Sequence, residues 1–491
     1  MEEELDAMKK NNVWRLTKLP EGRKSIQNRW IFKYKTNPKG EIEKYRARLV
    51  AKGFLQKYGI DFTETFSPVV RFDTIRFLLA LSAERKLRLE QFDVKIAFLL
   101  AKLDEEEIYM DQPEGFSDGT DRKCLLLQSI YGLKQAPRAF KSKFDDEMIK
   151  LGFIKSSADN CLFIRNHNGK LIIVCHYVDD GIICAPEESD IENFFSMLHG
   201  VFELSIKPLH FFLGVRVQID KHHNIHMSQT KYIKDIVTRF NLEETKTAAT
   251  PTDSQLYLRE EDDQPCEKPF RELIGSLNYI AIATRPDISF AISILSRHFA
   301  DFNRSDWLRA TRVLSNLDGT KDLGITFRGG NAEAKLEGYS DSDYATDPLT
   351  RRSISSQIFI YNNGPIVWCA NQQKVVTLSS TEAEFLAAGE ATKTALWLKQ
   401  LLKDIGIILT PTLQIDNISA IRLIKNPEFF KRVKHVDVKY KFICEKFAAR
   451  EVNIEHVRSE ENLADICTKN LPKGVFVKLR SLIGLRSCSQ F

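Results

Sequence analysis

An acidic pair interrupts one of the most apolar stretches of this chain. Residues 171–185, LIIVCHYVDDGIICA, comprise two apolar strand-like runs joined by Asp179-Asp180-Gly181, which predicts a hairpin with carboxylates at its tip. Asp-Gly is also ordinary hairpin-turn chemistry, so a purely structural role stays open for this pair. A third carboxylate, Asp93, lies inside the apolar run 89–99, where an acid is costly unless a cation or hydrogen bonds compensate it.

Carboxylates on two strands can bind two Mg²⁺ ions and so support phosphoryl transfer. The chain also carries cations upstream of these acids, since residues 9–57 contain fifteen Lys or Arg and only three Glu. Within them, residues 29–35 and 44–50 alternate basic with aromatic or apolar side chains, which predicts two strands with a cationic face and a turn at 37–40. Such a face is either merely solvated or holds phosphates. Together with the acids, it supplies the parts of a nucleotide polymerase.

Composition sets broader limits. The chain has 491 residues, of which 43% are hydrophobic and 28% charged, so it is not mainly disordered and is long enough for several domains. Its apolar runs fall far short of the roughly 20 residues that cross a bilayer, so we expect no membrane association. Nine cysteines without a Cys-x-x-Cys pair argue against zinc knuckles and a disulfide framework, and predict an intracellular protein.

The middle of the chain changes character twice. An acidic, Thr-rich and Pro-containing stretch at 243–269 predicts a linker. A helical block follows at 270–321, with a turn at Arg285-Pro286-Asp287 between its first two helices. Strand signals resume at 335.

The last third predicts the order strand, strand, strand, helix, strand, helix, strand, helix. The first strands are expected at 336–344, 356–361 and 366–369, and a capping box at Ser379 to Glu382 begins an amphipathic helix that ends near Gly406. Four acids fall on separate elements of this order: Asp341, Glu384, Asp416 and Asp465. Each alone is an ordinary surface or helix-terminal acid, but together we expect them to converge on one sheet end. Asp343 and Glu382 are the alternatives if the register is off by two.

Eight sequence blocks, in this order, resemble the reverse transcriptase of copia-type LTR retrotransposon polyproteins. They are YRARLVAKGF (45–54), FSPVV (66–70), FDVK (92–95), AFL (97–99), IYM (108–110), QPEGF (112–116), YGLKQAPR (131–138) and YVDD (177–180). The resemblance continues through FFLG (211–214), QTKYI (229–233), IGSL (274–277) and TRPDI (284–288). GYSD (338–341), SSTEAE (379–384), DN (416–417) and LADICTK (463–469) resemble the RNase H domain of the same polyproteins.

The resemblance implies a multidomain fold of the α+β and α/β classes. It is a right-hand polymerase with fingers, palm and thumb, followed by a helical connection and an RNase H-like domain. We expect the reverse transcriptase at 9–245, the linker with the helical thumb or connection at 246–334, the RNase H-like domain at 335–475 and a C-terminal tail at 476–491.

The implied function is RNA-directed DNA synthesis together with cleavage of RNA in RNA–DNA hybrids, both by two-metal phosphoryl transfer. By the resemblance, Asp93, Asp179 and Asp180 bind two Mg²⁺ ions in the palm. Two more are bound by the four later acids, Asp341, Glu384, Asp416 and Asp465, and Mn²⁺ is an alternative metal. The implied partners are an RNA template, a DNA primer, the RNA–DNA hybrid and deoxynucleoside triphosphates. The implied location is the cytoplasm, within virus-like particles, and the oligomeric state stays open.

Candidates for binding the triphosphate are Arg46, Arg48 and Lys52, with Lys134 as a weaker one. Phe98 matches the aromatic residue that packs against the sugar in related enzymes, although a core role is equally open. The turn at 211–214 would position the primer end. His435 and His456 either assist product release or are structural.

The sequence departs from the family pattern at Ile96, Leu100 and Ala101, where polar or flexible residues are usual, and at 205–208, which replaces a longer acidic stretch. The alternative to an active enzyme is therefore a catalytically impaired retrotransposon remnant that binds nucleic acid without turnover.

Overall fold

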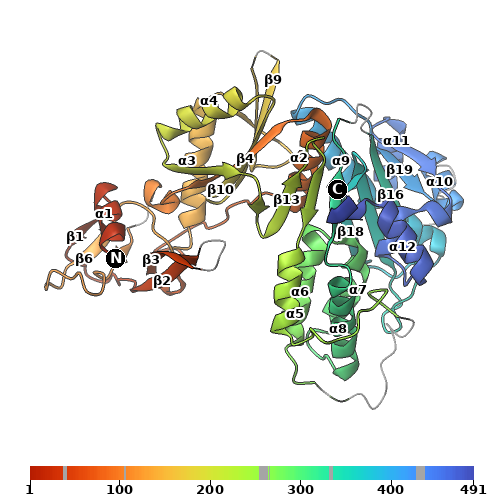
Figure 1. The fold of residues 1–491 in the computed structure, drawn as a ribbon, viewed down its shortest axis with the longest axis horizontal. Coiled ribbons are helices and arrows are strands. Elements are labelled where there is room, and N and C mark those ends of the chain that lie inside the picture. The colour runs from red at the N-terminus through yellow and green to blue at the C-terminus, as the bar shows by residue number, and fades with distance from the viewer. Residues whose placement is uncertain are drawn as a thin grey trace. The chain divides into compact units, whose positions relative to one another are not determined.

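The chain forms two compact units. The computed structural model describes residues 1–36, 41–103, 107–167, 169–253, 264, 266–330, 335–426 and 437–490 (Figure 1). The N-terminal unit comprises Met1–Val70, Glu90–Ser156 and Asn160–Lys207, and the C-terminal unit comprises Arg71–Leu89, Ser157–Asp159 and Pro208–Phe491. Each unit therefore combines segments that are distant in the sequence.

A six-stranded sheet with strand order β11-β4-β10-β9-β8-β7 lies in the N-terminal unit. Its strands are β4 (Arg88–Val94), β7 (Ile154–Lys155), β8 (Leu162–His167), β9 (Lys170–Tyr177), β10 (Asp180–Ala185) and β11 (Leu204–Pro208). Helices α3 (Ala136–Lys150) and α4 (Glu188–His199) pack their phenylalanines against side chains of this sheet such as Phe92 and Val174. This buried aromatic core fixes β4 beside β10.

The predicted hairpin with carboxylates at its tip is present, but its turn lies earlier than expected. Asp180 pairs with Tyr177, so the two-residue turn is Val178-Asp179 and Asp180 already begins β10. Val178 has a positive φ of 57°, as the first turn position of such hairpins requires. The prediction of an Asp179-Asp180-Gly181 connection is wrong because Gly181 lies in the strand, where it permits close packing rather than supplying a turn conformation.

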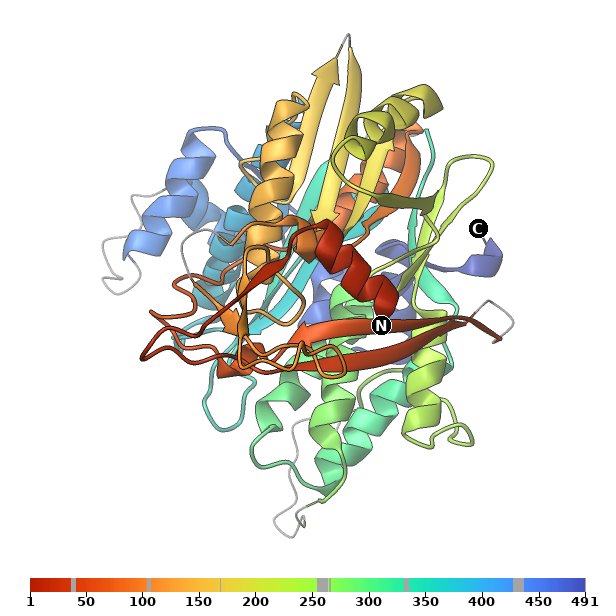
Figure 2. The same cartoon turned by 90° about the vertical axis from the view of Figure 1, so that its left-hand side faces the viewer.

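The two predicted cationic strands form a ribbon of β2 (Asn28–Thr36) and β3 (Ile42–Ala51), with α1 (Glu2–Lys10) beside it (Figure 2). Lys33 lies opposite Arg46 and Ile31 opposite Arg48, so these cations share one face of the ribbon. The predicted turn at 37–40 lies outside the described residues. A three-stranded sheet, order β1-β6-β5, completes this region; its strands are β1 (Trp14–Thr17), β5 (Tyr109–Met110) and β6 (Lys123–Leu126).

The predicted helical block is confirmed in the C-terminal unit. Helices that share one apolar core are α5 (Thr230–Arg239), α6 (Phe270–Ala283), α7 (Ser289–Leu295) and α8 (Arg304–Asp318). The turn predicted at Arg285-Pro286-Asp287 separates α6 from α7. There the buried Arg285 guanidinium donates to both oxygens of the buried Asp287 carboxylate, at 2.8 and 2.7 Å, which fixes the turn.

A five-stranded antiparallel sheet adjoins these helices within the same unit. Its strands, in spatial order, are β12 (Phe211–Phe212), β13 (Val215–Ile219), β14 (Ile225–Ser228), β15 (Leu323–Phe327) and β21 (Leu485–Ser487). The turn between β12 and β13 is the one predicted at 211–214, and the Tyr279 hydroxyl donates to its Leu213 carbonyl oxygen. Residues 476–491, expected as a tail, contribute most of α12 (Lys473–Leu482) and the strand β21.

A second five-stranded sheet, order β18-β17-β16-β19-β20, confirms the predicted three strands, helix and strand of the last third of the chain, but two helices rather than the predicted one precede its last strand. The strands are β16 (Leu336–Asp343), β17 (Ile354–Tyr361), β18 (Gly364–Gln372), β19 (Thr412–Ile415) and β20 (Asn453–His456), and the helices between them are α9 (Ser380–Asp404), α10 (Ile418–Lys425) and α11 (Asp437–Ala448). β16, β17 and β18 are antiparallel, whereas β19 and β20 continue in parallel. The Ser379 hydroxyl caps α9 by accepting from the Glu382 amide at 3.2 Å, as predicted.

The predicted domain boundaries at residues 245, 334 and 475 stay predictions, and the compact units divide the chain elsewhere. Helix α2 (Phe72–Arg85) belongs to the C-terminal unit although it precedes Asp93 in the sequence. Over the part of the chain that the structure describes, no helix is long and apolar enough to cross a membrane.

Arg76 fixes α2 within the C-terminal unit. Its guanidinium is fully buried, lies 3.8 Å from the centre of the Trp368 ring and pairs with Asp73 at 2.5 Å. It also donates to the carbonyl oxygens of Ile366 at 2.7 Å and Ile282 at 2.6 Å. Burial lowers the pKa of Arg76 to about 10, so the side chain remains charged at neutral pH.

Replacing Arg76 with Leu should lower the free energy of unfolding of the C-terminal unit by about 3 kcal/mol, because buried acceptors lose their donor. Urea denaturation would measure the change. Arg328→Leu, at an exposed arginine of the same unit, serves as the control and should cost less than about 0.5 kcal/mol. Equal losses in the two variants would contradict the role assigned to Arg76.

Candidate functional site

The first group of carboxylates lies at neighbouring strand ends in the N-terminal unit. Asp93 is the penultimate residue of β4, Asp179 lies in the β9–β10 turn and Asp180 begins β10. β4 and β10 are adjacent in the sheet, and the Val94 amide donates to the Asp179 carbonyl oxygen at 2.8 Å. Burial and the negative charges of Asp179 and Asp93 raise the pKa of Asp180 to about 6. The structure therefore brings the three predicted acids to one end of the sheet.

Gly181 allows β10 to approach β4 closely. A Cβ atom at this position would overlap the ring of Phe92, the residue before Asp93. The ring has little room to move, because it packs on Phe144, Phe194 and Phe195 with ring centres 6.4, 6.0 and 5.9 Å away. The spacing between Asp93 and Asp180 thus depends on a glycine.

Two β-branched residues beside these acids have positive φ angles, 51° at Ile96 and 57° at Val178. Such conformations cost about 1–3 kcal/mol each and persist only where the surroundings enforce them. Ile96 packs against an apolar core, as does Leu100, and Ala101 is fully buried. The apolar replacements noted in the sequence therefore fill cores beside the acids.

A cavity of about 990 Å³ opens beside Asp93, and residues of α1, β3 and β4 line it. Of the four cations predicted to bind a triphosphate, Arg46 shares this cavity with Asp93. Arg48 lies over the Tyr131 ring, 4.5 Å from its centre, and lines a neighbouring cavity of about 320 Å³ together with Arg46.

The other two predicted cations have partners of their own. Lys52 donates to the Gln27 side chain at 2.8 Å, and Lys134 donates to the Gln56 carbonyl oxygen at 3.2 Å. Phe98 is half-buried, with its ring edge-to-face on Tyr131 at 5.0 Å. These contacts give Phe98 a packing role, and of the four predicted cations Arg46 is the one that lines a cavity together with Asp93.

Acids of α1 form a part of this cavity that the sequence analysis missed. Glu3 pairs with Lys44 at 3.1 Å, and burial raises the pKa of Glu4, which also lines the cavity. These acids precede residues 9–57, the segment whose excess of Lys and Arg predicted the cationic face. In the sequence they are visible only as the acidic run at 2–4, which matches no catalytic motif.

The second group of carboxylates is tighter. Among the described residues, Asp341, Glu384 and Asp416 are the three whose potential ligand oxygens all lie within 4.8 Å of one another, a spacing that Asp93, Asp179 and Asp180 do not reach. Asp341 comes from β16 and Glu384 from the first turns of α9, whereas Asp416 follows β19 directly. Three separate elements thus converge at one sheet end, as predicted.

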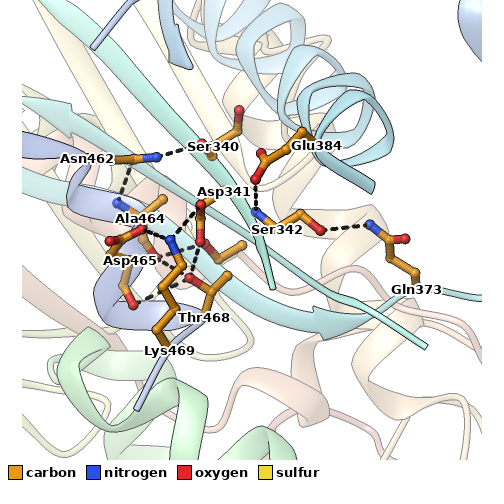
Figure 3. A network of polar contacts seen from close by, with 11 residues as sticks. Ser340, Asp341, Ser342, Gln373, Glu384, Asn462, Ala464, Asp465, Thr468 and Lys469 are labelled. Carbon is orange, nitrogen blue, oxygen red and sulfur yellow. Dashed lines mark hydrogen bonds and ion pairs between the residues drawn. The ribbon is translucent and has the colours of Figure 1, made fainter. Parts of the chain in front are cut away.

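Burial shapes the electrostatics of this second group. The Ser342 amide donates to Glu384 Oε1 at 3.3 Å, whereas Glu384 Oε2 is buried and accepts no hydrogen bond from the described residues (Figure 3). Burial and the charges of Asp341 and Asp416 raise the pKa of Glu384 to about 9. A buried carboxylate oxygen without a donor is costly, and a bound cation would compensate it. Because all the ligands offered are carboxylate oxygens, the group fits Mg²⁺ or Mn²⁺.

The fourth predicted acid, Asp465, has a different partner. The Lys469 ammonium donates to Asp465 Oδ1 at 2.6 Å and to Asp341 Oδ1 at 3.1 Å, and the Thr468 hydroxyl donates to Asp341 Oδ2 (Figure 3). Burial and the charge of Asp341 raise the pKa of Asp465 to about 7. Lys469 was not among the predicted site residues, although it ends the LADICTK block, because only the acid of that block matched a metal-ligand pattern.

Glu382 and Asp343, the alternative candidates to Glu384 and Asp341, make different contacts. Glu382 accepts from the Leu378 amide at 2.7 Å at the start of α9, and burial raises the pKa of Asp343. Neither belongs to the tight group. His456 is exposed at the end of β20, where it pairs with Ile415. His435 lies outside the described residues.

Comparison with known proteins accords with this geometry. The family described as "Reverse transcriptase (RNA-dependent DNA polymerase)" matches residues 11–254. Over 99% of its length the chain is 36% identical to the retrovirus-related Pol polyproteins from transposon TNT 1-94 of Nicotiana tabacum and from transposon RE1 of Arabidopsis thaliana. It spans 38% and 33% of those two polyproteins, respectively.

The fold has a solved counterpart in a foamy viral protease-reverse transcriptase in complex with dsDNA. The TM-score is 0.50 at 13% identity, over 93% of this chain and 81% of that one. The strands and helices described above thus share the fold of that solved reverse transcriptase. The chain belongs to the copia-type retrotransposon Pol polyproteins, in their reverse transcriptase region, which confirms the resemblance read from its motifs.

Replacing Gly181 with Ala should lower the free energy of unfolding of the N-terminal unit by about 1–3 kcal/mol, because the added methyl overlaps a ring held in a packed core. Urea denaturation would report it. The matched control is Gly275→Ala in α6, where the added methyl meets open space and a helix gains by up to about 1 kcal/mol. A neutral Gly181→Ala variant would show that β4 and β10 tolerate a wider spacing.

The raised pKa of Glu384 predicts a pH-dependent stabilisation by Mg²⁺. Between the ordinary carboxyl pKa and the raised pKa of Glu384, the unfolded state holds fewer protons than the folded state, so the stability of the metal-free protein falls as pH rises. Because a cation requires ionised ligands, its effect grows over the same range. The rise in Tm on adding Mg²⁺ should therefore be larger at about pH 8.5 than at about pH 5.5.

Glu384→Gln is the control for that measurement. It removes the carboxyl group whose raised pKa causes the effect, so the dependence of the Mg²⁺ effect on pH should flatten. If the rise in Tm on adding Mg²⁺ depends on pH in Glu384→Gln as it does in the wild type, the cation binds at another site.

Proposed function

We propose that this region of the polyprotein is an RNA-directed DNA polymerase that also cleaves RNA in RNA–DNA hybrids. The supporting observation is that the chain holds two separate carboxylate groups, each at one end of a different sheet, in a member of the reverse transcriptase family. Its substrates would be an RNA template, a DNA primer, deoxynucleoside triphosphates and the RNA–DNA hybrid. A cytoplasmic location within virus-like particles stays a prediction.

In the polymerase site, Asp93, Asp179 and Asp180 would hold divalent cations at the end of the sheet. Arg46 lines the same cavity and would bind the triphosphate, with Arg48 supporting it from the adjacent cavity. The half-buried Phe98 packs on Tyr131 and would help to position the sugar only through that packing.

In the cleavage site, Asp341, Glu384 and Asp416 would hold a cation, for which the buried Glu384 Oε2 is the available ligand. Divalent cations supply charge stabilisation for phosphoryl transfer and lower the pKa of water. The chain's own contribution is to hold these carboxylates at a fixed spacing and to keep hydrogen-bond donors of the described residues away from Glu384 Oε2.

The two activities should be separable by single substitutions. On a primed RNA template labelled on both strands, Asp179→Asn should reduce primer extension and Asp416→Asn should reduce RNA cleavage. Each loss should be at least about 10-fold, because removing a ligand costs no less than removing an outer-shell partner. The other activity of each variant should stay at the wild-type level, so each variant is the control for the other.

A folded wild-type protein that binds the hybrid but shows neither activity would contradict the proposal. It would support the alternative, a catalytically impaired remnant that binds nucleic acid without turnover. Cleavage without extension would place the defect in the polymerase site, where Ile96, Leu100 and Ala101 depart from the family pattern. Loss of both activities in both variants would contradict two separate sites.

A further inference from the structure

Lys469 distinguishes Asp465 from the other three acids of the second group. Asp341, Glu384 and Asp416 converge tightly, and Asp465 is not among them. The Lys469 ammonium lies instead between Asp465 and Asp341, within hydrogen-bond distance of an oxygen of each. A positive charge thus already occupies the position that a second metal ion shared by Asp341 and Asp465 would take.

The backbone around Lys469 holds that position firmly. The 3₁₀ turn Leu463–Cys467 is buried, and Asn462 ties it to β16 by donating to the Ser340 carbonyl oxygen at 3.1 Å. The Lys469 amide donates to the Asp465 carbonyl oxygen at 3.0 Å, so the two side chains leave the same turn. Thr468 contributes a further hydrogen bond to Asp341. Lys469 is therefore placed by a packed turn, unlike a lysine on a free surface arm.

We propose that the Lys469 ammonium permanently fills one of the two cation positions of this site, so that the site takes up one divalent cation, held by Asp341, Glu384 and Asp416. Asp465 is then a positioning residue for Lys469 rather than a metal ligand. The inference rests on the proposed cleavage function and changes its expected metal content from two ions to one.

Charge and donor geometry support this assignment. A second divalent cation between Asp341 and Asp465 would lie beside the ammonium, and the repulsion would expel one of them. The ammonium satisfies both acids with direct hydrogen bonds, which are strong when donor and acceptor are both charged.

The test counts Mn²⁺ ions bound to the full chain. The parent variant carries Asn at positions 93, 179 and 180, which removes the polymerase carboxylates from the count. Mn²⁺ binding is followed by electron paramagnetic resonance, without nucleic acid and with a hybrid whose RNA strand is 2′-O-methylated and cannot be cleaved. The parent should bind one Mn²⁺ at this site under both conditions, and Glu384→Gln should abolish it.

Removing the ammonium should open the second position. Lys469→Gln in the parent should bind two Mn²⁺ ions in the presence of the hybrid, whereas Lys469→Arg should still bind one. The matched control, Lys473→Gln at an exposed lysine of α12, should bind one. If Lys469→Gln does not fold, the count in the parent alone decides. Two Mn²⁺ ions in the parent, or one in a folded Lys469→Gln variant, would overturn the proposal.

Cleavage of an ordinary hybrid, measured with the palm residues intact, separates this inference from the proposed function. Absence of cleavage with one bound Mn²⁺ would overturn the function and leave the metal count standing. Cleavage with two bound Mn²⁺ ions would support the function and overturn the inferred metal count.

Discussion

Buried carboxylates of like charge, held close together, are the constraint on which this structure depends. Isolated, such groups either repel one another or take up protons, and the raised pKa values of Asp180, near 6, and Glu384, near 9, record that cost. A fold keeps such an arrangement only if the surrounding packing stabilises it. In this chain the compensation comes from two rigid sheets and, beside Asp341, from the ammonium of Lys469.

The two sites meet this constraint in different ways. In the N-terminal unit, the acids are positioned by backbone packing: Gly181 lets one strand approach the Phe92 ring, and strained residues form the adjacent turns. In the C-terminal unit they are positioned by side-chain contacts, because the turn that carries Asp465 also supplies Lys469 and Thr468.

Periodicity and motif spacing predicted much of this from the sequence. Five of the acids, Asp93, Asp179, Asp341, Glu384 and Asp416, lie on or directly after the elements predicted for them. Asp93 could be found because an acid within an apolar strand is rare. The hairpin turn was misplaced because Asp-Gly usually indicates a turn. Here Gly181 lies within β10, where a glycine is needed for close packing on Phe92. Lys469, the acids of α1 and the membership of α2 in the C-terminal unit were missed, because each depends on contacts between segments that are distant in the sequence.

The central claim is that each carboxylate group exists to bind divalent cations. Anomalous diffraction from crystals of the full chain soaked in Mn²⁺ tests it directly, since the peaks locate the ions without reference to activity. The account predicts one peak among Asp341, Glu384 and Asp416 and at least one beside Asp93 and Asp180. Peaks at neither group, or only at other acids of the surface, would contradict it.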